Sequence, residues 1–381
     1  MPRHAHAPLV LAALASTLGC AMDLPEPGLI ISTRVLAIKT TVTQPLIPDE
    51  ADAETPKAEA LPFETVTIEP FIVGPLGPIE PDTIDPVWIA CELGAGQGLF
   101  ACIQDAMPIG LDEIPDCVPP DITQLTSLDA LPESVSPCVI GRTGTPEYVV
   151  PISTNVFIGG AIELTMIAGD PAGTSTDECA RQLLGGDYQL PNDCVYAVQR
   201  LDVGPLEQLL VLADMFGVPL PGFEVPDPED IPEPDRHPRI SEVRVSLVGA
   251  DGEPIDEGTP IAMGDVVEVP LAAVLRVDVV SPEEDLQVYP IAVNNGESYE
   301  ERDEAYSGSW FRTWGTLLAG SSDDPASYNE WAFAPGAQDP EDEPAPPDER
   351  ARLYYVVRDG RQGVNWFWFE VATTDPVVTD P

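Results

Sequence analysis

Short runs in which apolar and polar residues alternate follow one another along most of the chain, and β-branched residues are frequent in them. Proline, glycine and aspartate separate these runs, as they separate the strands of many all-β proteins. In the first half of the chain the pattern predicts strands within residues 29–43, 64–73, 87–91, 98–104, 147–153 and 154–169.

Residues 174–217 follow a different pattern. The sequence STDECARQLL at 175–184 opens with small polar residues before an apolar run, which is typical of one or two helical turns. The alternating sequence CVYAVQRLDV at 194–203 predicts a strand. A helix is predicted at 205–217, because Pro205 suits a first helical position and Gly217 suits a helix end.

A proline-rich and acidic stretch divides the chain. Seven prolines fall between residues 219 and 238, and six acidic residues fall between Glu224 and Asp235. Such a segment buries little apolar surface and its charges repel one another, so the sequence predicts a stiff, extended linker.

A second β-rich region begins at Ile240, with seven or eight alternating runs in about 130 residues, which suits an antiparallel sandwich. We therefore expect a mainly β protein with two Ig-like antiparallel β-sandwich domains, the first of which carries a short helical insertion. The expected boundaries are 28–218 for the first domain, 219–238 for the linker, 239–372 for the second domain and 373–381 for a disordered tail.

The first residues have the form of a secretory signal. Arg3 precedes an apolar run of about ten residues, Leu9 to Leu18, and a membrane span would need about 20. The run ends in the sequence STLGC, which resembles a bacterial lipobox, the motif at which diacylglycerol is attached to the cysteine. Thr17 departs from the leucine that is usual at its position.

We therefore expect a lipoprotein signal peptide at 1–19, a lipid on Cys20 and a tether at 20–27. The alternative is ordinary signal-peptidase cleavage after Ala15 or Ala21. With the lipid, the protein would be held at the bacterial cell envelope, in the outer membrane.

The cysteine count agrees with this expectation. With Cys20 set aside as the lipid carrier, an even number remains, which predicts up to three disulfides in an oxidising compartment. Of the fifteen ways to pair them, we favour the sequential one, because each bond then closes a short loop rich in glycine or proline. The six cysteines are Cys91, Cys102, Cys117, Cys138, Cys179 and Cys194.

Several strand motifs resemble those of a known group of proteins. The sequences RVLAIK, VTIEPFIVGP and VWIAC near the start, and SWFRTWG and YYVVRDGRQGVNWFWFEV near the end, are similar to uncharacterised envelope lipoproteins of myxobacteria and their relatives. The resemblance implies Ig-like or PKD-like β-sandwich regions behind a lipobox. It brings an address and a fold but no activity, and the acidic insertions and the cysteine-rich middle depart from it.

The charge excludes some classes of partner. Lys and Arg number 17 against 65 Asp and Glu, for a formal net charge of −48. Nucleic acids and anionic lipid surfaces are bound by basic residues, so we expect neither as a partner.

Catalytic motifs are scarce in the sequence. The patterns G-x-S-x-G and H-E-x-x-H and the P-loop are absent, and His237, in the expected linker, is the one histidine that follows the signal peptide. A histidine without fixed surroundings is a poor general base, so we expect no catalytic role for it. Paired carboxylates of the glycosidase type remain an alternative, but 65 acidic residues single out no pair.

Metal binding has weak sequence support. No C-x-x-C pair exists, which argues against zinc. Acidic runs at 282–285, 322–324 and 339–342 lack the spacing of a calcium loop, so a solvated acidic surface is the default and weak calcium binding is the alternative. We expect no other cofactor.

Aromatic residues are concentrated near the C-terminus, and both faces of VNWFWFEV are apolar. Alternation places Trp366 and Trp368 on one face of this strand, and Trp310, Arg312 and Trp314 on one face of another. Two interpretations follow. These residues pack in a core or against the first domain, or they form an exposed platform for a sugar ring or a partner's apolar patch.

The sequence thus predicts a non-enzymatic envelope lipoprotein that acts in surface recognition or scaffolding, with an envelope protein or a glycan as partner. The alternative is a carbohydrate-binding module or a glycan-acting enzyme that uses carboxylates.

Overall fold

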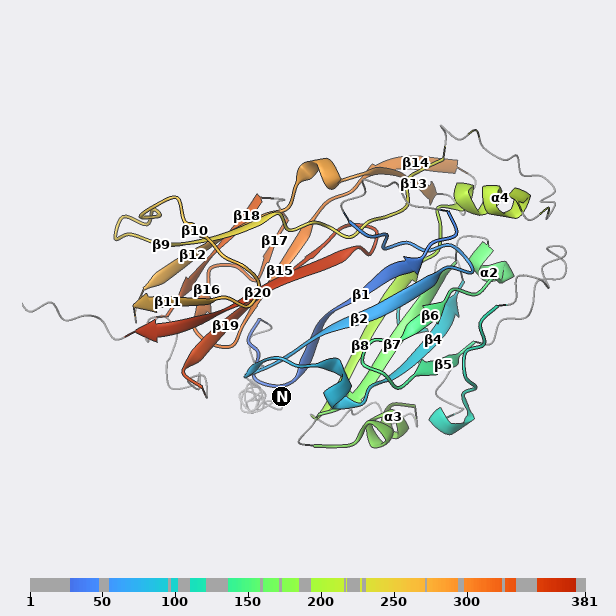
Figure 1. Ribbon diagram of the computed structural model, residues 1–381, viewed down its shortest axis with the longest axis horizontal. Coiled ribbons are helices and arrows are strands. Elements are labelled where there is room, and N and C mark those ends of the chain that lie inside the picture. The colour runs from blue at the N-terminus through green and yellow to red at the C-terminus, as the bar shows by residue number, and fades with distance from the viewer. Residues whose placement is uncertain are drawn as a thin grey trace, which may run out of the picture.

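Four β-sheets stacked in layers, together with a two-stranded hairpin, make up most of the described chain in the computed structural model (Figure 1). The pairing of strands is antiparallel with one exception in the named strands, the parallel pair β11 (Val266–Pro270) and β20 (Val364–Thr374). The structure describes residues 28–47, 55–94, 97–101, 110–120, 136–157, 160–170, 173–184, 193–215, 217, 227, 231–270, 273–293, 298–323, 326–333 and 348–374.

Two of the sheets form an N-terminal sandwich. In the first sheet the strand order is β1-β2-β3, and β6 also pairs with β2. Its strands are β1 (Arg34–Gln44), β2 (Thr65–Gly74), β3 (Gly77–Pro78) and β6 (Glu147–Val149). The second sheet has the order β5-β4-β7-β8. Its strands are β4 (Val87–Leu93), β5 (Cys138–Gly141), β7 (Ala161–Gly169) and β8 (Cys194–Asp202).

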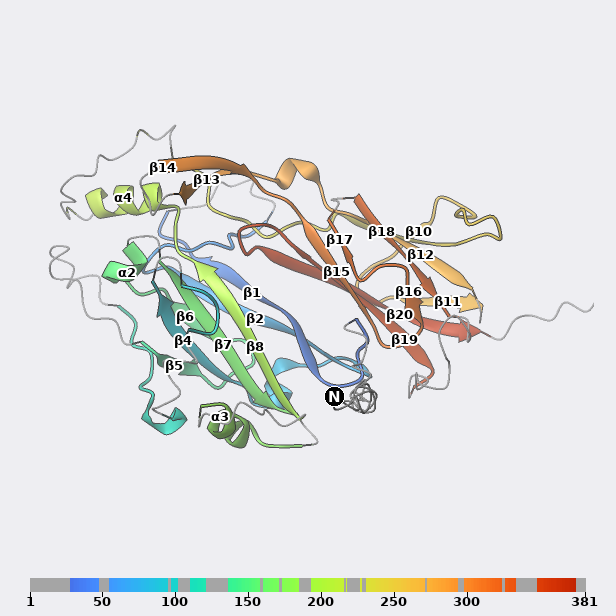
Figure 2. The ribbon, with the colours of Figure 1, turned by 180° about the vertical axis from the view of Figure 1, so that it is seen from behind.

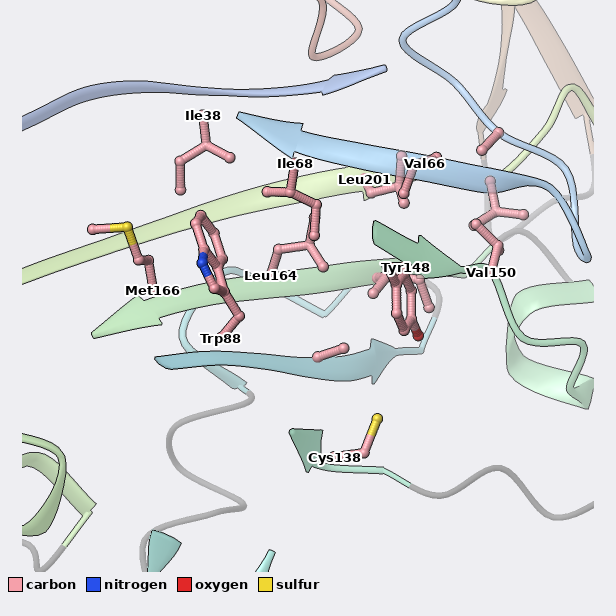
Figure 3. Packing of buried hydrophobic residues seen from close by; sticks show 14 of the residues in the cluster. Ile38, Val66, Ile68, Trp88, Cys138, Tyr148, Val150, Leu164, Met166 and Leu201 are labelled. Carbon is pink, nitrogen blue, oxygen red and sulfur yellow. The ribbon is translucent and has the colours of Figure 1, made fainter. Parts of the chain in front are cut away.

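The core of this sandwich lies between its two sheets. Ile38 and Ile68 from one sheet face Leu164 and Met166 from the other, and all four are buried (Figure 3). Trp88 on β4 is fully buried among them, and its indole Nε1 donates a hydrogen bond to the Thr143 carbonyl at 3.0 Å. That hydrogen bond satisfies the one polar atom that a buried tryptophan brings.

Helices cover parts of the N-terminal sandwich. α3 (Thr176–Leu184) buries Ala180 and Leu184 against Ile89 and Ile167, on the outer face of the second sheet. The other α-helices in the described part of the chain are α2 (Thr154–Phe157) and α4 (Leu206–Met215), and 3-10 turns lie at Pro81–Ile84 and Leu111–Glu113. The predicted helices at 175–184 and 205–217 are thus confirmed.

Disulfides tie the irregular segments to this sandwich. Cys117 is bonded to Cys138, and Cys179 on α3 is bonded to Cys194 on β8, as the sequential pairing predicts. Cys91 is also disulfide-bonded, while Cys102 lies outside the described residues. Each of the two described bonds closes a short loop, which limits the conformational freedom of the unfolded chain.

The other two sheets form a C-terminal sandwich. Their strand orders are β10-β9-β12-β18-β16 and β11-β20-β19-β15-β17. The strands not yet given are β9 (Glu242–Leu247), β10 (Thr259–Pro260), β12 (Val274–Val280), β15 (Ser307–Arg312), β16 (Thr316–Leu317), β17 (Ser321–Ser322), β18 (Ala326–Ala332) and β19 (Arg350–Arg358). A hairpin of β13 (Val288–Val293) and β14 (Ser298–Asp303) follows a 3-10 turn at Glu283–Asp285.

Both strand orders follow the immunoglobulin pattern, in which strands A, B, E and D form one sheet and C, F and G the other. In the C-terminal sandwich these strands are β9, β12, β18 and β16, opposite β15, β19 and β20. In the N-terminal sandwich β1, β2 and β6 correspond to A, B and E, and β4, β7 and β8 to C, F and G. The predicted mainly β, Ig-like sandwich fold is confirmed.

The two sandwiches pack face to face through one sheet of each (Figures 1 and 2). At this junction, Phe71 of β2 stacks on Trp366 of β20, with ring centroids 5.0 Å apart and planes 2° from parallel. Buried residues from both sides surround this pair, namely Ile30, Leu36, Ala37, Val73, Tyr354, Val356 and Val364. A continuous apolar layer therefore joins the two halves.

Several sequence predictions were wrong in detail. Residues 98–100 form no strand, and 154–157 form a helical turn rather than a strand. Strand β14 was missed because its sequence, SYEERD, is almost wholly polar. Thr373 and Thr374, assigned to a disordered tail, belong to β20. Cys20, the signal peptide and the tether lie outside the described residues.

The predicted linker shows the largest difference. Its described part, 231–238, lies against the junction, and Pro234, Asp235, His237 and Pro238 are buried. The backbone of this segment bonds to residues 56–59, where the Asp235 carbonyl accepts a hydrogen bond from the Ala58 amide at 2.8 Å. Backbone pairing and burial therefore fix a segment whose composition predicts an extended spacer.

Candidate functional site

The exposed aromatic platform, the second of the two interpretations of the tryptophan residues, does not form. Trp310 is 1% exposed and packs on Tyr355 in the C-terminal core, with ring centroids 4.4 Å apart. Trp366 and Trp368 pack at the junction, on the opposite face of the same sheet. The strand β20 is apolar on both faces because one face meets the other sheet of its sandwich and the other meets the N-terminal half.

Arg312 and Trp314 also make contacts within the C-terminal sandwich. Arg312 is 1% exposed, and its Nε donates a hydrogen bond to the Gly315 carbonyl. Trp314 packs at the edge of the C-terminal core, and its ring lies 6.2 Å from that of Phe333. The five residues are thus divided between a core and the junction, so the first of the two interpretations is confirmed and the exposed platform was wrong.

Polar side chains gather at one part of the junction instead. Four carboxylates surround Arg361, and we call them the carboxylate cluster: Glu59, Asp235, Glu304 and Asp359. They come from four separate segments, which are the loop before β2, the segment 231–238, the residue that follows β14 and the turn between β19 and β20. The tertiary structure alone brings these segments together.

Arg361 binds two of the carboxylates directly. Its Nη2 lies 2.5 Å from Glu59 Oε2 and its Nη1 lies 3.3 Å from Glu304 Oε1. Nη1 also donates to Gln287 Oε1 at 2.7 Å, and the guanidinium lies over the Tyr289 ring, 5.0 Å from its centroid. This one side chain therefore links the N-terminal half, the β13–β14 hairpin and the β19–β20 turn.

Among the described residues, no cation is bonded to the other two carboxylates, Asp235 and Asp359. Asp359 Oδ1 accepts hydrogen bonds from the amides of Arg361 and Gly363, which fixes the turn. Burial away from water raises the pKa of Asp235, and the charge of Asp359 raises it further. Burial likewise raises the pKa of Asp359. Ionising these two carboxyl groups in their buried positions therefore costs free energy.

His237 is buried next to the cluster and is fixed on both sides of its ring. Its Nε2 lies 2.9 Å from the Thr40 carbonyl, and its Nδ1 accepts a hydrogen bond from the Val364 amide at 3.1 Å. These partners select the neutral tautomer that carries its proton on Nε2. Burial lowers the pKa of His237 to about 3, and the positive charge of Lys39 contributes. The expectation of an unanchored linker histidine was wrong.

We expect His237→Asn to lower the free energy of unfolding at pH 7.5 by about 1–3 kcal/mol, because a buried amide or carbonyl loses its partner. Below pH 6.5, His237 becomes protonated in the unfolded wild-type chain but stays neutral in the folded protein. Wild-type stability from this group therefore falls as the pH drops toward 3. Urea unfolding at a series of pH values should show the gap between wild type and variant narrowing below pH 6.5. A gap that stays constant contradicts this assignment.

Of the three acidic runs considered for weak calcium binding, one supplies an ion pair, one is exposed where it is described, and one lies outside the described residues. Asp285 is paired with Arg239 at 3.0 Å. Asp323 is exposed, and residues 339–342 are not among the described ones. Within the described ranges, no three His, Cys, Asp or Glu side chains converge as a metal site.

Sequence reasoning missed the carboxylate cluster. Glu59 and Arg361 are 302 positions apart, and no local spacing relates them. One signal was present, since Asp235 and His237 stand in a run of prolines that can hold an extended segment against a surface.

Comparisons with known proteins give weak similarities. No family model and no curated protein matches the sequence. Dimeric latent PorU from Porphyromonas gingivalis shows 9% identity over 91% of this chain and 24% of that chain, with a TM-score of 0.18. The chain thus spans about a quarter of the length of that structure.

Two further structures are similar at the same low level. A BSP domain of a biofilm associated protein shows 7% identity over 94% of this chain and 68% of that chain, with a TM-score of 0.15. The CupB6 tip adhesin from Pseudomonas aeruginosa shows 11% identity over 91% of this chain and 100% of that chain, with a TM-score of 0.16. The description of the fold therefore depends on strand order and core packing.

Among the described helices, none is long and apolar enough to cross a membrane.

Proposed function

We propose that this protein is a non-enzymatic lipoprotein of the bacterial cell envelope, held in the outer membrane through Cys20, and that it acts as a rigid scaffold. The observation that carries the proposal is the apolar junction. Phe71, Trp366 and Tyr354 pack together there, so the two sandwiches have one mutual orientation. A fixed orientation suits a spacer or a scaffold that must present its ends at a set distance.

The histidine and the arginine that a binding or catalytic site could use are bonded within this junction. His237 bonds to Thr40 and Val364, and Arg361 bonds to Glu59 and Glu304. The aromatic side chains considered for glycan binding pack in a core or at the junction. Their positions favour scaffolding over the glycan-binding alternative.

Two features support an exported location. The N-terminal sequence has the order of a lipoprotein signal, with its cysteine at position 20. The disulfides Cys117–Cys138 and Cys179–Cys194 are of the kind that persists outside the reducing cytosol.

The test combines anchoring and activity. Cells that express the full chain are grown with a labelled fatty acid, and the Cys20→Ser variant is the matched control. We expect label and outer-membrane sedimentation for the wild type and neither for the variant. We also expect purified protein to release no sugar from envelope polysaccharides. Equal fractionation of both proteins contradicts the anchor. Sugar release that a single Asp→Asn or Glu→Gln substitution abolishes contradicts the non-enzymatic role.

A further inference from the structure

Three buried carboxylate oxygens at the junction have no hydrogen-bond partner among the described residues. They are Oδ1 and Oδ2 of Asp235 and Oδ2 of Asp359. Asp235 is only 1% exposed, so bulk solvent does not reach its carboxylate. A buried polar atom without a partner costs free energy, and a buried charge costs more. These oxygens therefore need an explanation.

The charged groups around Asp235 do not explain why its carboxylate oxygens lack hydrogen-bond partners. The charged groups that act on it are Asp359, Arg361, Glu304 and Glu59, so three of its four neighbours are also acidic. The single cation, Arg361, is already bonded to Glu59 and Glu304. Among the described residues, Asp235 and Asp359 thus have no cation bonded to their carboxylates, although Arg361 lies near enough to act on both by its charge.

The backbone beside the two aspartates adds another oxygen. A Cβ atom placed on Gly363 would lie 1.9 Å from Asp359 Oδ2 and 2.7 Å from the carbonyl oxygen of Arg236. Asp359 Oδ2 and the Arg236 carbonyl oxygen therefore both lie against Gly363 and close to each other, and any larger residue at this position would clash with them. Arg236 directly follows Asp235, so this carbonyl belongs to the same segment as the unpartnered carboxylate.

We propose that a divalent cation of the calcium type binds between Asp235 and Asp359. Its ligands are the three unpartnered carboxylate oxygens and the Arg236 carbonyl, with water completing the shell. Oxygen-only ligand sets of mixed geometry suit Ca²⁺, whereas Mg²⁺ demands a near-ideal octahedron. Two carboxylates give a weak site of about 10⁻⁴–10⁻³ M, the range of extracellular calcium modules.

The cation links parts of the molecule that the chain keeps apart. Asp235 and Arg236 lie in the segment that pairs with residues 56–59 of the N-terminal half, while Asp359 lies in the β19–β20 turn of the C-terminal sandwich. Calcium would therefore stabilise the junction. The site stands whether or not the chain is a lipid-anchored scaffold.

Thermal unfolding of the purified full-length protein tests the site. The protein is freed of metal with EDTA, dialysed, and titrated with CaCl₂ or MgCl₂ at pH 7.5 and constant ionic strength. We expect a saturable rise in Tm of about 2–5 °C by 10 mM CaCl₂, because a ligand that binds only the folded state stabilises it by mass action. An equal concentration of MgCl₂ should give less than half of this rise.

Two matched variants locate the site. Asp235→Asn keeps the size of the side chain and removes its charge, so we expect it to fold and to lose the calcium-dependent rise. Asp323→Asn removes an exposed acid from one of the acidic runs and should keep the rise. The wild-type titration by itself decides whether a site exists, even if a variant fails to fold.

Three results would overturn the proposal. The first is a wild-type Tm that does not respond to calcium; if the Tm of the metal-free protein then rises as the pH falls from 9, a shared proton neutralises the pair. The second is an equal rise with CaCl₂ and MgCl₂, which is general screening of acidic charge. The third is loss of the rise in Asp323→Asn but not in Asp235→Asn.

Discussion

Replacing Phe71 by alanine should lower the free energy of unfolding by about 3–5 kcal/mol, the usual cost of removing a buried phenylalanine ring. Phe71 is 5% exposed, and its ring contacts Trp366 and Tyr354 across the junction. The variant leaves a cavity between two rigid sheets, which can close only by moving one sandwich against the other. Urea unfolding followed by tryptophan fluorescence measures the loss.

The same experiment tests whether the two sandwiches unfold together. We expect a single transition for the wild type and two separate transitions for Phe71→Ala, because the variant weakens the contacts that couple the halves. Leu76→Ala, at an exposed position of the N-terminal half, is the control and should change stability by about 0.5 kcal/mol or less. If Phe71→Ala costs no more than this control, the halves are independent and the rigid-scaffold proposal fails.

Replacing Arg361 by methionine should cost about 3–5 kcal/mol, because removal of one partner from a buried ion pair leaves the other charge uncompensated. Here Glu59 and Glu304 both lose their cation. Methionine keeps much of the apolar stem of arginine, so the loss reports on charge more than on packing. Urea unfolding at pH 7.5 is the measurement.

Arg350→Met provides the matched control. Arg350 is also paired with a carboxylate, Glu370, but its side chain is 48% exposed, and pairs of this kind contribute about 0–1 kcal/mol.

The pH gives a second check on Arg361→Met. Burial raises the pKa of Glu59 and of Glu304, and loss of the guanidinium raises each further. A carboxyl with a raised pKa stabilises the folded state below its unfolded pKa and loses this contribution as the pH rises. The deficit of the variant should therefore shrink as the pH falls from 7.5 toward 4. A deficit independent of pH would show that charge is not its cause.

Local sequence patterns were enough to predict most of the elements. The strand β9 alternates strictly, and its buried apolar residues Val243 and Val245 are the ones that the alternation places on one face. The helix α4 begins after Pro205 and ends before Gly217, as the helix signals indicate. Such signals succeed because the side-chain direction in a strand or helix depends on near neighbours alone.

The sequence also indicated which cysteines pair in disulfides. Cys117–Cys138 and Cys179–Cys194 each span a short stretch of chain within one sandwich. Short-range closure has a small entropic cost before the bond forms, so sequential pairing was the natural expectation.

The tertiary structure alone decided what covers each face. The sequence of β20 showed apolar residues on both sides, but not that Phe71 and Leu36 of the first sandwich cover the Trp366 side. The same packing holds residues 231–238 against the junction, although the sequence predicted an extended spacer there. It also placed Asp235 beside Asp359. Periodicity records how much apolar surface a strand must bury. The partner that buries it is chosen by contacts between residues hundreds of positions apart, for which a local pattern carries no signal.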